Sequence, residues 1–159
     1  MFETTSLLPD QALADVMGAL GRNLRTTSDT EEGGIILNRM VDLCNFNLAR
    51  LFVVWDSVLA TITEVCTADE RPELRGLAAS ALCRILGQAL RKGALAMSER
   101  PEEAQDELLR HLEVLLRSQH DFTRARICEG LLSILQTSGQ ELHPTATSAD
   151  HRAWNVEGG

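Results

Sequence analysis

The spacing of apolar residues predicts the secondary structure of this chain. Along most of its length they recur at intervals of three and four positions, which is the spacing of one face of an α-helix. The pattern predicts six helices, at about residues 9–24, 35–45, 48–66, 73–91, 101–116 and 122–138. Segment 25–34 is polar and contains two glycines, so it is expected to be a loop. An alternative for the second and third helices is one helix kinked between Asn45 and Asn47.

The same spacing predicts which side chains form the core. The residues expected to point inward are Leu13, Val16, Met17, Leu20, Leu24, Ile36, Leu37, Met40, Val41, Cys44, Leu51, Phe52, Trp55, Val58, Leu59, Ile62, Val65, Leu74, Leu77, Ala78, Ala81, Leu82, Ile85, Leu86, Leu90, Ala104, Leu108, Leu109, Leu112, Leu115, Leu116, Phe122, Ile127, Cys128, Leu131, Leu132 and Leu135. Leu and Ala dominate this set, and aromatic residues are only 4% of the chain. This balance favours packing of helices on helices over packing of strands.

An internal repeat indicates how these helices are organised. Aligning residues 72–86 with residues 121–135 gives a register of 49 residues, in which Arg75 falls on Arg124 and Leu82 on Leu131. Each unit is a helix, a short turn and a second helix with an arginine in its first turn, as in HEAT-type repeats. The predicted fold is therefore all-α, a HEAT/armadillo-like helical repeat (α-solenoid) of about six helices whose stacked pairs share one core.

The chain is expected to contain one repeat domain and two flanking segments. Residues 1–8 are predicted to be an N-terminal extension, residues 9–139 the helical repeats, and residues 140–159 a disordered tail. The tail contains Pro144 and several Ser and Thr residues. Neither end of the predicted stack shows an obvious polar cap, which favours a segment of a longer solenoid.

The charge of the chain narrows the choice of partners. Its formal net charge of −8 gives no general attraction to nucleic acid or to anionic lipid. Lys92 is the only lysine, and the arginines are expected mainly to pair within the molecule. Solenoids commonly bind proteins on the surface lined by their second helices. This location gives four candidate protein-binding residues, Arg75, Arg84, Arg124 and Glu129.

Catalytic, metal and cofactor motifs are missing from the sequence. It has no glycine-rich phosphate loop, no zinc-protease motif and no C-x-x-C pair, so no catalytic residue, metal ligand or cofactor is predicted. The four cysteines, Cys44, Cys66, Cys83 and Cys128, lie in apolar runs and are expected to be buried, reduced thiols of a cytoplasmic protein. A pairing of His111 with Cys128 is the one enzymatic alternative. No apolar run is long enough for a membrane span, so contact with membranes is expected only through partners.

Residues 37–55 resemble a known family. Leu37, Met40-Val41, Asn47, Arg50 and Trp55 match the L-x-x-L-V, N-x-x-R and W pattern of large BIG-type Arf exchange factors. The likeness is closer still to the Mon-two family, related Golgi scaffolds without the catalytic Sec-seven domain, and it continues to about residue 142. After Gln140 the chain departs from the family, which has a further Trp-containing helix there.

The resemblance implies a non-catalytic scaffold in vesicle traffic between Golgi and endosomes. Implied partners are Arf-like small GTPases, a Dopey-type scaffold and a lipid flippase. No catalytic residue carries over, since the exchange domain has no counterpart in this sequence. The alternatives are a generic HEAT-repeat adaptor of another pathway, a truncated fragment of a larger scaffold, or a small helical enzyme.

Overall fold

A computed structural model describes residues 3–92 and 101–138, and the described elements are all helical. They are the 3-10 helix η1 (Glu3–Leu7), α1 (Asp10–Thr26), α2 (Thr30–Phe46), the 3-10 helix η2 (Leu48–Val53), α3 (Trp55–Ala68), α4 (Pro72–Arg91), α5 (Pro101–Leu116) and α6 (Asp121–Ser138). The all-α prediction with about six helices is confirmed. The predicted tail, residues 140–159, lies outside the described residues.

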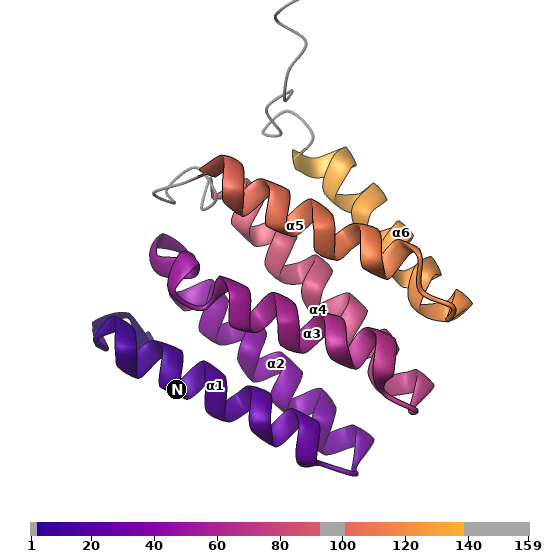
Figure 1. Cartoon of the computed structure of the whole chain (residues 1–159). Coiled ribbons are helices and arrows are strands. Elements are labelled where there is room, and N and C mark those ends of the chain that lie inside the picture. The colour runs from indigo at the N-terminus through magenta and orange to yellow at the C-terminus, as the bar shows by residue number, and fades with distance from the viewer. Residues whose placement is uncertain (1–2, 93–100, 139–159) are drawn as a thin grey trace, which may run out of the picture.

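The α-helices alternate between two layers (Figure 1). Helices α1, α3 and α5 lie side by side in one layer, and α2, α4 and α6 form the other. Within the second layer α4 packs between α2 and α6, and it also packs on α3 of the first layer. Consecutive helices therefore form three antiparallel pairs stacked side by side, the arrangement that a helical repeat predicts.

Aliphatic side chains from both layers meet in one continuous core. Leu13 and Met17 of α1 are completely buried, as are Leu59 and Ile62 of α3 and Leu82 of α4. Since a buried aliphatic side chain contributes about 1.5–3 kcal/mol, this core is the main source of stability. Trp55, at the start of α3, is 4% exposed and is part of the core.

The predicted loop at residues 25–34 is wrong. Helix α1 continues to Thr26, and α2 begins at Thr30, only four residues later. Asp29 is the N-cap of α2, where its Oδ1 accepts a hydrogen bond of 2.9 Å from the backbone N–H of Glu31. Gly33 and Gly34 lie within α2, and their lack of a side chain allows the close approach of α4: a Cβ at Gly33 would lie 2.7 Å from Cδ1 of Leu74.

The boundary between the predicted second and third helices is a true break. Helix α2 ends at Phe46, and the 3-10 helix η2 separates it from α3, so neither one kinked helix nor a helix over 48–66 is correct. Asn47 closes α2 by donating from Nδ2 to the carbonyl of Leu43 (2.8 Å) and to Oγ1 of Thr5 (2.8 Å). This second bond ties η1 to the end of α2.

Eight residues expected in the core are exposed instead. They are Phe52, Leu77, Leu109, Leu116, Phe122, Cys128, Leu132 and Leu135. Helical periodicity identifies the apolar side of a helix, but it does not show how much of that side a neighbouring helix covers. Five of the eight lie on α5 and α6 beyond residue 115, where no described helix packs on the far side of the last pair. The side chain of Ala104 lies outside what the structure describes.

We expect Gly130→Ala to destabilise the protein although alanine favours helix. A Cβ at Gly130 of α6 would overlap Sγ of the half-buried Cys83 on α4, and such overpacking typically costs about 1–3 kcal/mol. The matched control is Gly18→Ala in α1, where the added Cβ would meet only Nη1 of Arg22 at 3.4 Å. Urea unfolding should give a lower midpoint for Gly130→Ala and a higher one for Gly18→Ala. Stabilisation by both changes would show that α4 and α6 are not in close contact.

Candidate protein-interaction surface

Arg75 lies inside the fold, although it was predicted to bind a partner. It is 9% exposed, and its Nη1 donates a hydrogen bond of 2.7 Å to the carbonyl of Asp69, the C-cap residue of α3. The thiol of Cys66 donates to the carbonyl of Arg75 at 3.8 Å. The prediction assumed an exposed side chain, and burial corrects it: this guanidinium closes the turn between α3 and α4.

Arg124 makes the same interaction one repeat later. Its Nη1 donates a hydrogen bond of 2.6 Å to the carbonyl of Ser118, and its Nη2 pairs with the carboxylate of Asp121. Ser118 follows Asp69 by 49 positions, the register predicted from the sequence. The recurrence of one hydrogen bond in that register supports the repeat, and it assigns Arg124 a structural role in the turn between α5 and α6.

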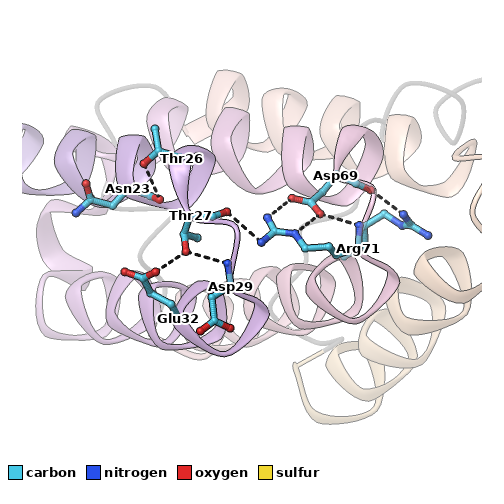
Figure 2. Close-up of polar contacts among 8 residues, drawn as sticks. Asn23, Thr26, Thr27, Asp29, Glu32, Asp69 and Arg71 are labelled. Atoms are coloured by element: carbon cyan, nitrogen blue, oxygen red, sulfur yellow. Dashed lines mark hydrogen bonds and ion pairs between the residues drawn. The ribbon is translucent and has the colours of Figure 1, made fainter.

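The first turn of the stack uses an arginine from the next pair. Figure 2 shows Arg71 reaching the carbonyl of Thr27, the C-cap residue of α1, with a distance of 3.0 Å from Nη1. The fourth residue of α2 is Gly33, where α4 and α6 have an arginine. Arg71 therefore supplies the guanidinium that α2 lacks, and it joins the first helix pair to the second.

Asp69 holds Arg71 in place with a two-pronged contact. Nε of Arg71 lies 2.9 Å from Oδ1 of Asp69, and Nη2 lies 2.7 Å from Oδ2, as seen in Figure 2. This hydrogen-bonded ion pair lowers the pKa of the Asp69 carboxyl, and burial opposes the shift only in part. The cluster is thus a charged clamp on the backbone.

Arg84 and Glu129 remain available at the surface. Both are exposed and lie on the outer side of the α2–α4–α6 layer. Nη1 of Arg84 donates to Oδ1 of Asn38 on α2 (2.7 Å), and Glu129 accepts from Nη1 of Arg126 (3.3 Å). Such exposed pairs contribute little to stability, so a partner can exchange them for its own contacts at small cost.

An apolar strip on the same layer was missed at the sequence level. Ile35 of α2, Leu77 of α4 and Phe122 of α6 are 49%, 44% and 51% exposed. A Cβ at Gly34, the residue before Ile35, would lie 3.2 Å from Cδ1 of Leu77, so Leu77 packs on the turn of α2 that contains Ile35.

Phe122 continues this strip onto α6. It lies against Gly76, the residue before Leu77, where a Cβ would be 2.5 Å from Cε1 of the ring. The guanidinium of Arg126 lies over the ring, 5.2 Å from its centre. We define Ile35, Leu77 and Phe122 as the apolar strip. The sequence analysis missed this strip because it placed Leu77 and Phe122 in the core. Gly34 and Gly76, which precede Ile35 and Leu77, were the sequence feature that could have indicated it.

The proposed His111–Cys128 pair consists of residues with different surroundings. Nδ1 of His111 lies 2.9 Å from Oγ1 of Thr63 on α3, whereas Cys128 is exposed on α6.

Burial raises the pKa of the Cys44 and Cys66 thiols to about 12 and that of Cys83 to about 11. These three are protonated at neutral pH. The expectation of four buried thiols holds for Cys44 and Cys66, fails for Cys128, and is half met by Cys83.

Residues that carry the family resemblance are structural in this chain. Arg50 donates to the carbonyls of Leu8 (2.6 Å) and Thr5 (3.1 Å) and to Oδ1 of Asn47 (3.0 Å). With Asn47, whose Nδ2 donates to Oγ1 of Thr5, it fixes the N-terminal segment on the start of the stack, and Trp55 is buried in the core. Asn47, Arg50 and Trp55 therefore have structural roles in this chain.

The clamp at Asp69 predicts a pH-dependent stability. Asp69→Asn should lower the melting temperature at pH 7, because Arg71 loses a charged acceptor. The carboxyl has a lower pKa in the folded chain than in the unfolded chain, where it is about 3.9. Its contribution is therefore complete above that value and is lost as the pH falls through the folded-state pKa.

Thermal unfolding from pH 7 to pH 2.5 checks this expectation. The difference in melting temperature between the natural chain and Asp69→Asn should be constant at neutral pH and should narrow as the pH falls below about 4. In an Arg71→Met background the same Asp69→Asn change should have little effect. A difference that does not narrow at all between pH 7 and pH 2.5 would mean that the carboxylate charge is not what stabilises the turn.

Comparisons with known proteins do not assign a function to this surface. No protein-family model, curated protein or solved structure matches the chain. Among the described residues, no group of His, Cys, Asp and Glu is arranged to hold a metal ion, and no helix is long and apolar enough to cross a membrane. The resemblance to the Mon-two family, seen in residues 37–55, therefore stays a prediction from the sequence.

Proposed function

We propose that this chain is a non-catalytic scaffold segment in Golgi–endosome vesicle-mediated transport. It binds other proteins through the outer surface of α2, α4 and α6. The observation that supports the binding role is the apolar strip, Ile35, Leu77 and Phe122, which crosses three successive second helices and is about half exposed at each. Exposed apolar residues next to charged groups are typical of protein-binding patches.

The polar surroundings of the strip define how a partner would be recognised. Arg126 lies over Phe122, and Arg84 is exposed further along α4, so cations flank the apolar residues. Arginine is enriched at protein interfaces because it packs its flat face and donates in pairs to carboxylates. A partner segment with one or two large apolar side chains and a neighbouring carboxylate fits this surface.

The trafficking part of the proposal rests on the sequence. The Leu37, Asn47, Arg50 and Trp55 pattern resembles Mon-two scaffolds, and Arg50 ties the N-terminal segment to η2 in this structure. Arf-like small GTPases and Golgi scaffolds are therefore the first partners to test, with membrane contact arising through them. A generic HEAT-repeat adaptor is the alternative, supported by the 49-residue register alone.

Leu77→Glu should abolish partner binding without unfolding the protein. Leu77 is 44% exposed, so a carboxylate there remains solvated in the free chain but would be buried without a partner in the complex. Affinity capture from cells, followed by mass spectrometry, should recover GTPases and Golgi traffic proteins with the natural chain. With Leu77→Glu we expect at least a tenfold loss of those proteins.

Val114→Glu is the matched control for this experiment. Val114 is 47% exposed but lies on α5 in the other layer, so its substitution should leave capture unchanged. Equal capture by Leu77→Glu and the natural chain would remove the strip from the proposal. If the proteins lost with Leu77→Glu belong to another pathway, the strip would still be the binding surface, and the generic adaptor would be the favoured function. Circular dichroism establishes that both variants are folded.

A further inference from the structure

The last helix pair presents a second apolar surface, on the side facing away from the stack. On α6 it consists of Ala125, Cys128, Leu132 and Leu135, all exposed, with Leu132 at 59% and Leu135 at 55%. Leu109 and Leu116 of α5 extend it, at 51% and 39%. We define these six residues as the open face.

Helix geometry places the open face opposite the contacts inside the stack. At about 100° per residue, Cys128 and Leu132 each lie about 200° around α6 from Gly130, which packs on Cys83 of α4. Leu109 is likewise about 200° around α5 from His111, which contacts α3. The open face thus points away from α3 and α4.

The positions equivalent to the open face are buried or half-buried in the two preceding second helices. Counting from the first residue of each helix, positions 5, 8, 12 and 15 are Gly34, Leu37, Val41 and Cys44 in α2, Gly76, Ala79, Cys83 and Leu86 in α4, and Ala125, Cys128, Leu132 and Leu135 in α6. All are apolar or glycine. In α2 and α4 this side is covered by the next helix, through contacts such as those of Gly34 with Leu77 and of Cys83 with Gly130. The open face therefore continues an interface that the fold already uses twice.

The other end of the layer, at α2 and η1, carries charged groups beside the exposed apolar side chains of Leu7 (84%) and Phe46 (46%). Glu32 and Arg39 are exposed on the side of α2 opposite Val41, and η1 packs on α2. Placing this end against Leu132 and Leu135 would bury charges on apolar groups, so copies of the chain do not match head to tail. Glu32 and Arg39 are thus polar residues on the outer side of the first helix pair, where the sequence showed no obvious polar cap.

The open face is complementary to itself. Its α6 half has two small residues, Ala125 and Cys128, followed by two large ones, Leu132 and Leu135. In an antiparallel pair of α6 helices related by a two-fold axis, Leu135 of one copy lies over Ala125 of the other, and Leu132 lies over Cys128. Residue 130 is the midpoint of both pairs, so a single register places small against large throughout.

The charges around the open face also allow it to meet its own copy. The arginines whose pairs are resolved on this helix pair each have an acidic partner within one turn: Arg117 with Glu113 (2.6 Å), Arg124 with Asp121, and Arg126 with Glu129 (3.3 Å). On α6 two of these pairs balance Asp121 and Glu129 against Arg124 and Arg126, whereas Glu103 and Asp106 add exposed acidic charge on α5. Contact between two α6 helices therefore has no large like-charge repulsion.

We propose that this protein forms a two-fold symmetric dimer through the open face, with α5 and α6 packed on the same helices of a second copy and the two α6 helices antiparallel. The dimer buries the exposed leucines of the last pair and leaves Leu77, on α4, outside the interface. It does not depend on the proposed function, because none of the open-face residues belongs to the apolar strip, although Phe122 lies only about 60° around α6 from Ala125.

Sedimentation equilibrium of the full chain tests the dimer. The chain should sediment with twice its 17.5 kDa mass at micromolar concentration and dissociate on dilution. Leu132→Glu buries two unpaired carboxylates in the dimer and should raise its dissociation constant by about 100-fold or more. Leu7→Glu, at an 84% exposed residue of η1, should leave it unchanged. A monomer at every concentration, or a dimer that Leu132→Glu leaves intact, would overturn the proposal.

A pair of size exchanges tests the antiparallel register. Ala125→Leu places leucine over leucine, Leu135→Ala leaves a gap, and each change alone should weaken the dimer about tenfold. The double variant restores one large and one small residue in each contact and should recover the natural dissociation constant. Additive losses in the double variant would contradict this register.

The exposed thiol of Cys128 gives an independent measurement. Cys44 and Cys66 are buried, so Cys128 should be the fastest of the cysteines to react with a maleimide. In the natural chain its alkylation should slow at least fivefold as the protein concentration rises, whereas in Leu132→Glu the rate should be constant. Slow alkylation at all concentrations would mean that the chain covers its own open face, which would also overturn the dimer.

Discussion

The stack depends on guanidinium groups that bind the carbonyl at the end of each first helix. A helix leaves its last carbonyls without backbone partners, and a tight turn into the next helix shields them from water. Arg75 and Arg124 each bind the carbonyl six residues earlier, and Arg71 binds that of Thr27. Each bond satisfies a carbonyl at a turn between the two layers of helices, and the aliphatic core fills the space between those layers.

Part of this architecture was predictable from the sequence. Leu, Ile and Val at helical spacing identified the helices and most of the core, because burying aliphatic groups dominates the energetics. The arginine at the fourth position of α4 and α6 was visible as a repeat, but its acceptor was not. A backbone carbonyl has no sequence signature, so Arg75 was interpreted as a surface residue. Gly33 and Gly34 similarly indicate a loop unless the approach of Leu74 is known.

The exposed apolar residues show where sequence periodicity stops being informative. Leu77 and Leu82 have the same chemistry and lie in the same helix, yet one is 44% exposed and the other is fully buried. The difference comes from their angle around α4 relative to α2, α3 and α6, which is a property of the assembled layers. The candidate surface therefore appeared only with the fold, and of the predicted binding residues only Arg84 and Glu129 lie on it as expected.

The use of arginine at the helix turns has a chemical consequence for the whole chain. Arginine carries the donors that these turns need, and lysine occurs once, at Lys92 directly after α4. Reactions directed at primary amines, including ubiquitin transfer, acetylation and amine coupling, thus have one side chain to act on within this sequence. Among side chains, attachment through an amine would therefore occur at a single position, at the end of α4.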